Sequence, residues 1–239
     1  MKFFIQFFLC GILTSLVFPP FFLIPIGFIV FPYLFYLAQR KEFIYLSYKY
    51  HFISGFLYGL GFFSVYLMWI KEPFFINDLT KNYFIISYLL IIYCSLFFGI
   101  IFFILKFFNN ILIKFIVFPG LIVSGELICA SLSYGFPWFS FSLIHAANFT
   151  GTSIIFYVGT YGLSYISIII FLFPTFFLIK KLNEKKIILI FYLILFIILT
   201  ALIILRVKSS DIDSANKVTI TLAQTNLPIN QKLNNSKIE

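Results

Sequence analysis

Residues 187–205 read IILIFYLILFIILTALIIL, a run without a single charged side chain. An α-helix rises about 1.5 Å per residue, so a run of this length crosses the roughly 30 Å hydrocarbon core of a bilayer. A surface helix of a soluble protein carries a polar face for water, and this segment has none. The stretch therefore predicts a helix that spans a membrane.

The rest of the chain has the same character. Of its 239 residues, 62% are hydrophobic and 10% are charged, and the mean hydropathy is +1.07. Soluble domains are about a quarter charged, so this chain has too few charged residues to cover a surface that faces water. These values exclude an ordinary soluble globule.

Six further apolar segments precede the quoted one. They run over about 3–18, 20–38, 52–70, 83–105, 111–130 and 152–179. Lys2 precedes the first segment, as in a signal peptide, but Pro19-Pro20 and another apolar run follow it in place of a cleavage site. Pro174 in the long sixth segment predicts a tilt or kink. We predict an all-α polytopic membrane bundle of about seven transmembrane helices, with residues 1–206 as its domain.

The net charge of +9 lies in short clusters between the apolar runs, which is typical of topology signals and not of nucleic-acid binding. Placing the N-terminus in the cytoplasm puts ten basic residues inside: Lys2, Arg40, Lys41, Lys49, Lys106, Lys114, Lys180, Lys181, Lys185 and Lys186. The opposite loops carry only Lys71 and Lys81, beside Glu72 and Asp78. The bias predicts a multi-pass protein of the cell inner membrane, with a cytoplasmic N-terminus and a periplasmic C-terminal tail.

The composition changes after the last apolar run. Residues 207–216 form a polar linker, and KVTITLAQTNLP follows at 217–228. There, Val218, Ile220 and Leu222 alternate with small or polar residues, which indicates a β-strand. Because a single strand is not stable alone, residues 217–239 are expected to begin an extracytoplasmic domain that is incomplete within this sequence.

Two features near the outer end of the fifth segment are candidates for a site. Glu126 lies inside the span, where an ionisable group is a functional candidate. It either holds a polar lipid headgroup or the following loop, or reaches the interface or a neighbouring helix. The uncharged loop at 131–151 places Tyr134 and Trp138 at headgroup depth, as an aromatic belt or a surface for lipid tails. His145 in this loop is either a proton carrier or a structural hydrogen-bonding residue.

The third segment ends in GFLYGLGFFSVYLMWI, in which Gly55, Gly59 and Gly61 form a small-residue face for close helix packing. The three cysteines, Cys10, Cys94 and Cys129, lie inside apolar stretches at spacings that suit neither a metal site nor a disulfide framework. We interpret them as packing residues. The sequence shows no nucleophile–base arrangement, P-loop or dinucleotide fingerprint, and we predict no metal and no cofactor.

Five stretches resemble, in order, the apolipoprotein N-acyltransferase family. VFPPFFLIPIGFIVFPYLFYL resembles its first hairpin, GFLYGLGFFSVYLMWI its third helix, and YVGTYGLSYISIIIF its sixth helix. PGLIVSGELICASLSYGFPWFSFSLIHA resembles its fifth helix, in which the Gly135-Phe136-Pro137-Trp138 loop begins nine residues after Glu126. KVTITLAQTNLP, with Gln224, Asn226 and Pro228, resembles the first strand of the family's appended α/β nitrilase-like domain.

The resemblance implies an enzyme that moves an acyl chain from a phospholipid to the N-terminal diacylglyceryl-cysteine of a bacterial lipoprotein. Its chemistry runs through a thioester on a cysteine of the nitrilase-like domain, with a Glu as base and a Lys at the oxyanion. The implied partners are the phospholipid donor, the lipoprotein acceptor, the membrane, and a nitrilase-like half if that is encoded separately. Residues Glu126, Tyr134, Gly135, Pro137, Trp138 and His145 are the candidates for a lipid site or for support of its loop.

The chain also departs from the family pattern. Where the family usually has an Arg three residues after the intramembrane Glu, Cys129 stands here, so the expected ion pair with Glu126 is missing. The Glu, Lys and Cys triad is expected downstream of residue 239. No catalytic residue is therefore assigned, and the chain alone is expected to be inactive. One alternative is a polytopic transporter, against which the spans carry few polar groups that could line a path. The other alternative is a non-catalytic membrane anchor or subunit.

Overall fold

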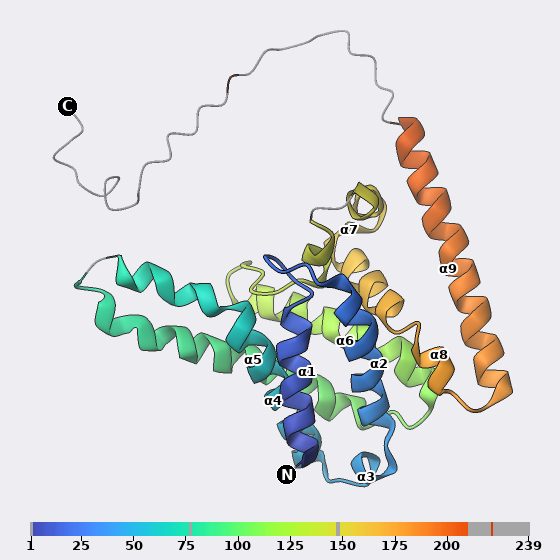
Figure 1. The fold of residues 1–239 in the computed structure, drawn as a ribbon, viewed down its shortest axis with the longest axis horizontal. Coiled ribbons are helices and arrows are strands. Elements are labelled where there is room, and N and C mark those ends of the chain that lie inside the picture. The colour runs from blue at the N-terminus through green and yellow to red at the C-terminus, as the bar shows by residue number, and fades with distance from the viewer. Residues whose placement is uncertain (1, 77, 147–148, 210–220, 222–239) are drawn as a thin grey trace.

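A computed structural model describes residues 2–76, 78–146, 149–209 and 221. Within them the chain forms nine α-helices and three short 3-10 helices and no strand (Figure 1). The α-helices are α1 (Lys2–Ser15), α2 (Ile24–Gln39), α3 (Lys41–Ile44), α4 (Tyr48–Tyr66), α5 (Ile86–Leu105), α6 (Ile111–Leu132), α7 (Phe149–Phe171), α8 (Thr175–Leu178) and α9 (Leu182–Ser209). The 3-10 helices are η1 (Met68–Phe75), η2 (Lys81–Ile85) and η3 (Phe141–His145). The predicted strand and most of the linker lie outside the described residues.

Each of the seven predicted apolar segments contains a helix, which confirms the all-helical membrane class for the described residues. In the part of the chain that the structure describes, four stretches are long and apolar enough to cross a bilayer: Lys81–Leu105, Ile111–Leu132, Ser153–Phe171 and Leu182–Val207. A fifth forms if α4 and η1, which meet at a 48° bend, count as one span. The apolar helices α1 and α2 are shorter, so the total of seven spans stays a prediction.

Prolines explain the shortness of the first two helices. The predicted segments 3–18 and 20–38 become helices that end at Ser15 and begin at Ile24. Between them lie Pro19 and Pro20, which lack the N–H group that a helix interior requires. The chain turns there, and the Leu23 amide donates back to the Leu16 carbonyl at 2.9 Å. The turn therefore takes the place of the last residues of the first predicted segment and the first residues of the second.

Helix α4 packs between α1 and α5, and glycines allow the close approach. A Cβ atom at Gly55 would collide with the Phe98 carbonyl of α5, and one at Gly61 with the Phe8 carbonyl of α1. At Gly59 it would lie 2.8 Å from Cα of Ser95. All three glycines thus face a neighbouring backbone, as the small-residue pattern predicts.

The helical path from α7 to α9 is interrupted twice, at Gly159 and after Phe171. Gly159 has φ 68°, a left-handed value inside α7 that glycine adopts at low cost. The helix then ends at Phe171, and Pro174 caps the short α8, so the chain breaks at the predicted proline. Helix α9 follows, largely exposed, with the Tyr192 hydroxyl donating to the Ile169 carbonyl of α7 at 2.7 Å. Its exposure suits a helix that faces lipid.

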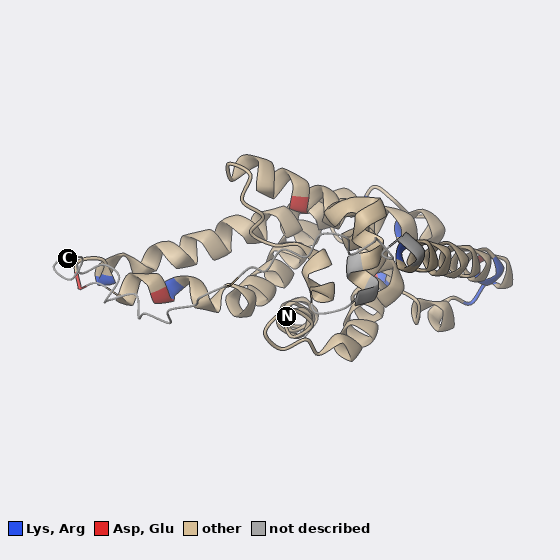
Figure 2. Ribbon diagram, turned by 90° about the horizontal axis from the view of Figure 1, so that it is seen from above, with Lys and Arg blue, Asp and Glu red and all other residues tan. Residues whose placement is uncertain are grey.

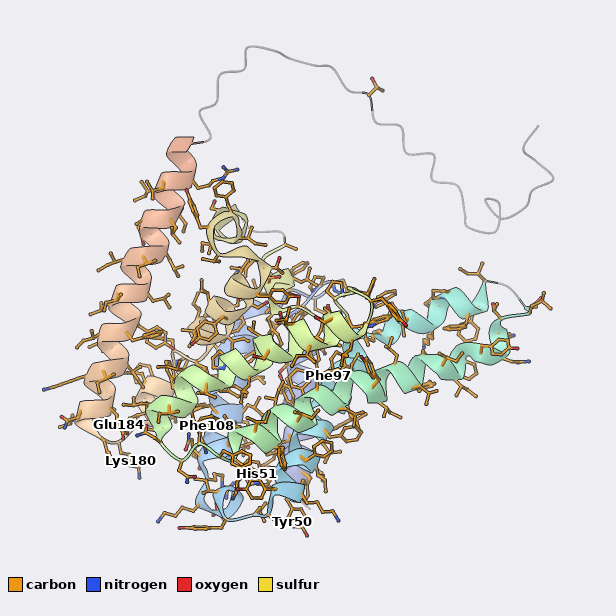
Figure 3. All side chains as sticks on the ribbon, turned by 180° about the vertical axis from the view of Figure 1, so that it is seen from behind. Tyr50, His51, Phe97, Phe108, Lys180 and Glu184 are labelled. Carbon is orange, nitrogen blue, oxygen red and sulfur yellow. The ribbon has the colours of Figure 1, made fainter. Side chains whose placement is uncertain are left out.

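Charged residues are few along the ribbon (Figure 2). The turns after α2, α5 and α7 lie at one end of the bundle, where Tyr50, His51, Phe108, Lys180 and Glu184 are labelled in Figure 3. We call this the basic end. The α1–α2 turn, the α4–η1 junction and the loop before α7 lie at the opposite end, called here the loop end.

Candidate functional site

Glu126 is the centre of a polar cluster at the loop end. It lies on α6, is only 2% exposed, and accepts three hydrogen bonds from two other segments. The Phe141 amide donates to Oε1 at 2.8 Å, and the hydroxyls of Ser164 and Ser140 donate to Oε2 at 2.9 and 3.3 Å. The carboxyl group therefore ties η3 and α7 to α6.

These three hydrogen bonds are the interactions that the Glu126 carboxyl group has in place of an ion pair. The described residues contain two ion pairs, Arg40–Glu42 and Lys181–Glu184, and neither includes Glu126. Donors alone surround its carboxyl group, which is the arrangement that an ionised carboxylate accepts. A buried charge needs such hydrogen bonds when it has no counter-ion. The amide and two serines thus satisfy Glu126 without a cationic partner among the described ion pairs.

The serine hydroxyls form an ordered network. Besides their contacts with Glu126, the Ser140 hydroxyl oxygen lies 2.9 Å from the Ser142 hydroxyl oxygen and 3.3 Å from that of Ser164. The Ser142 amide donates to Ser164 Oγ at 2.9 Å. None of these serines is among the site residues predicted from the sequence.

The Tyr134–Trp138 segment ends α6 in a strained turn. Tyr134 has φ 54° and Gly135 has φ 86°, both in the left-handed region, and the Gly135 amide donates to the Ala130 carbonyl at 2.8 Å. Tyr134, Phe136 and Pro137 are exposed. The half-buried Trp138 ring lies 4.5 Å from the Phe136 ring and packs against the core. The segment thus displays aromatic side chains beside the Glu126 cluster.

His145 ends η3 and contacts α7. Its Nε2 lies 2.8 Å from Ser167 Oγ, and the Ser167 hydroxyl donates to the Leu163 carbonyl at 2.6 Å. The tautomer of the ring decides which of Nε2 and the Ser167 hydroxyl donates in this contact. Burial lowers the pKa of the imidazole, which favours the neutral ring. Its buried Nδ1 has no hydrogen-bond partner among the described residues.

Two hollows flank η3 and share Leu143 as a wall. The larger, about 420 Å³, lies among the α1–α2 turn, the end of α4 and η1, and its polar lining consists of Ser15, Tyr66 and Glu72. The smaller, about 120 Å³, is lined by Ser142, Leu143, His145, Ala146, Gly151, Ile155 and Leu163. Neither is lined by a described Lys or Arg. Glu126 binds the first residue of η3, and His145 is the last residue of η3. Both candidate residues therefore lie close to Leu143, which lines both hollows.

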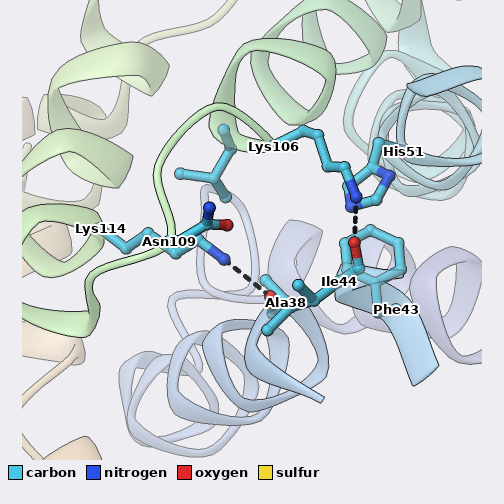
Figure 4. Close-up of a pocket in the computed structure, with 8 residues that line it drawn as sticks. Ala38, Phe43, Ile44, His51, Lys106, Asn109 and Lys114 are labelled. Carbon is cyan, nitrogen blue, oxygen red and sulfur yellow. Dashed lines mark hydrogen bonds between the residues drawn. The ribbon is translucent and has the colours of Figure 1, made fainter. Parts of the chain in front are cut away.

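A different arrangement occupies the basic end (Figure 4). Lys114 is 3% exposed and donates to the Ala38 carbonyl at 3.2 Å, while Lys106 donates to the carbonyls of Ile44 and Leu46. Ala38 and Ile44 lie in the last turns of α2 and α3, where backbone carbonyls lack helical partners. The two lysines thus join the α5–α6 corner to the ends of earlier helices.

The cysteines are buried at 3%, 0% and 1% exposure for Cys10, Cys94 and Cys129. Their burial within α1, α5 and α6 agrees with their interpretation as packing residues. Among the described residues no group of three or more His, Cys, Asp or Glu side chains is placed to hold a metal ion.

Comparison with protein families gives a direct result. The sequence matches the N-terminal domain of apolipoprotein N-acyltransferase over residues 10–173, a range that begins within α1 and continues past the end of α7. A search of curated proteins gave no match. The matched range contains Glu126, η3 and both hollows, and it confirms the resemblance found in the sequence. The chain belongs to the apolipoprotein N-acyltransferase family, whose N-terminal domain it carries.

Proposed function

We propose that the described helices are the membrane part of an enzyme that transfers an acyl chain from a phospholipid to the N-terminal diacylglyceryl-cysteine of a lipoprotein. In this proposal the larger hollow at the loop end receives lipid acyl chains. The observation that carries it is this 420 Å³ space, whose lining is mostly apolar with few polar groups, as in small-molecule sites.

The candidate residues hold part of the wall of the larger hollow in place. Leu143 forms part of its wall, and η3, which bears Leu143, is held by the bond from the Phe141 amide to Glu126. Glu126 is therefore a positioning residue in this proposal. The aromatic Tyr134–Trp138 segment lies beside it, at the depth where lipid headgroups meet acyl chains.

Acyl transfer itself is assigned to no described residue. A thioester needs a thiolate that substrate can reach, and all three cysteines are buried within helices. The chemistry would come from a nitrilase-like domain, joined to the bundle or encoded separately. We expect the purified 239-residue chain to transfer no acyl group to a diacylated lipopeptide, and any robust turnover would contradict this placement.

The orientation follows from charge. We propose that the basic end faces the cytoplasm and the loop end faces the periplasm across the inner membrane, because Lys and Arg are retained on the cytoplasmic side. The loop end then lies in the outer leaflet, where a lipid tail can reach the larger hollow.

Photocrosslinking tests the lipid site. The chain is placed in phospholipid nanodiscs with a small fraction of phospholipid that carries a diazirine on one acyl chain. Labelled peptides should concentrate around Pro19–Phe21 and Met68–Trp69, which line the hollow. Val65→Trp should fill the hollow and remove this label. Val117→Trp, at a half-buried position on α6 that lines neither hollow, should keep it. Labelling spread evenly over the exposed helices, and unchanged by Val65→Trp, would refute the proposal.

A further inference from the structure

Another hollow, of about 370 Å³, lies on the outside of the bundle between α2 and α8, and we call it the α2–α8 groove. It is lined by Ile29, Pro32, Tyr33, Tyr36, Pro174 and Leu178. Four of these side chains are also exposed, so the groove opens sideways from the helices. Its volume is in the range of small-molecule sites, which is about 300–1,000 Å³. In a membrane, a sideways opening of this kind meets lipid tails.

The groove extends toward the basic end of the bundle. Its α2 wall runs from Ile29 to Tyr36, and Arg40 follows one turn later, while α8 ends two residues before Lys180. Lys180 is labelled at this end in Figure 3. The helical rise from Ile29 to Arg40 is about 16 Å, and half of the hydrocarbon core is about 15 Å thick. The groove and the two cations therefore match the length of a lipid in one leaflet.

The side chains near this end have hydrogen-bond donors to offer. The rings of Tyr33 and Tyr36 lie 6.3 Å apart, and neither hydroxyl has a hydrogen-bond partner within the described residues. Arg40 donates from Nε to Glu42 at 3.1 Å, so the N–H groups of its two terminal nitrogens stay available. Lys180 is exposed and belongs to neither described ion pair. Such donors, two of them on cations, favour a phosphate group.

Charge at this end indicates the kind of phospholipid. Residues 40–42 and 180–186 contain six basic and two acidic side chains. Each Lys or Arg near a membrane surface favours anionic lipid by about fivefold. The excess of basic residues therefore favours a headgroup with a net negative charge over a zwitterionic one.

We propose that the α2–α8 groove binds an anionic phospholipid of the leaflet that borders the basic end. One tail lies along Tyr33 and Pro174, and the phosphate accepts hydrogen bonds from Arg40 and Lys180. This lipid is a bound ligand and not the acyl donor, because the groove shares no lining residue with the larger hollow at the loop end.

Headgroup selectivity tests the proposal on the full chain in phosphatidylcholine nanodiscs. Phosphatidylglycerol and phosphatidylcholine with the same diazirine-bearing tail are each added in trace amount. The phosphatidylglycerol should label residues 29–36 and 174–178 at least about fivefold more than the phosphatidylcholine, and Lys180→Gln should remove most of this difference. Lys186→Gln is the matched control, because Lys186 is an exposed lysine at the same end but outside the groove, and it should keep the difference.

Blocking the groove tests the place of the tail. Leu178→Trp should fill the groove and remove the label of both lipids. Leu189→Trp, at an exposed position on α9 outside the groove, should keep the label. Because the loop-end peptides expected under the proposed function are read separately in the same digest, either site can fail without the other.

Three results would overturn the proposal. Equal labelling by the two lipids would remove the headgroup site, and equal losses in Lys180→Gln and Lys186→Gln would assign the preference to the general surface charge. An unlabelled groove in a chain that crosslinks to a second copy through α2 or α8 would make this face a dimer interface.

Discussion

Replacing Glu126 tests whether one carboxylate holds the loop end together. In Glu126→Ala the Phe141 amide, on a residue that is 0% exposed, loses its acceptor. A buried unsatisfied donor costs about 1–3 kcal/mol, and the small cavity adds about 1 kcal/mol. The serines regain partners among themselves, so we expect a total loss of about 2–4 kcal/mol. Glu126→Gln keeps an acceptor for Phe141 but makes the bonds neutral, which should cost about 1 kcal/mol.

Unfolding by SDS in mixed micelles measures these values, and limited proteolysis within η3 reports whether the loop is released. Ser131→Ala is the matched control, because this exposed serine on the same helix bonds only to the Leu127 carbonyl. It should stay within about 0.5 kcal/mol of the parent chain. A loss below about 0.5 kcal/mol for Glu126→Ala would refute the anchoring role. A Glu126→Gln variant as stable as the parent would show that the carboxyl carries a proton.

Three further outcomes follow from other regions. Gly61→Ala should destabilise the bundle by about 1–3 kcal/mol in the same assay. Gly120→Ala should be neutral, because its new Cβ would meet its nearest atom at 3.8 Å. Equal effects of the two substitutions would contradict the packing argument. Burial lowers the pKa of His145, so the stability contributed by its neutral ring should be fully present above about pH 6.5 and should fall as the pH drops below that value. The fall should be less steep in His145→Gln. An unchanged slope would show that His145 does not titrate on unfolding. Single cysteines at Lys49 and Lys81, in a chain whose native cysteines are replaced, should react with impermeant maleimide from opposite sides of sealed vesicles; labelling from one side would refute the topology.

The helical class could be predicted because it depends on composition within short windows. A segment such as 187–205 has only one way to satisfy its backbone in hydrocarbon, and the structure places a helix there. Helix ends were less predictable. Around the proline pair at 19–20, α1 ends earlier and α2 begins later than hydropathy indicates, because a missing N–H group does not enter a hydropathy average.

The polar cluster was only half predictable. Glu126 stands out because a carboxyl group in an apolar run is rare, and the sequence indicated that it holds a headgroup, the following loop or a neighbouring helix. The identity of its partners depends on tertiary packing that brings Ser164 of α7 next to the loop of Ser140. Serines are common in membrane helices and carry no distinguishing signal.

The two lysines at the basic end have a consequence for the order in which the protein is made. Lys114 reaches a carbonyl 76 positions earlier in the chain, and Lys106 reaches one 62 positions earlier. The first four helices emerge from the ribosome before either lysine exists, so their corner stays open during that part of translation. These contacts form only after the α5–α6 corner has been made and packs against the ends of α2 and α3.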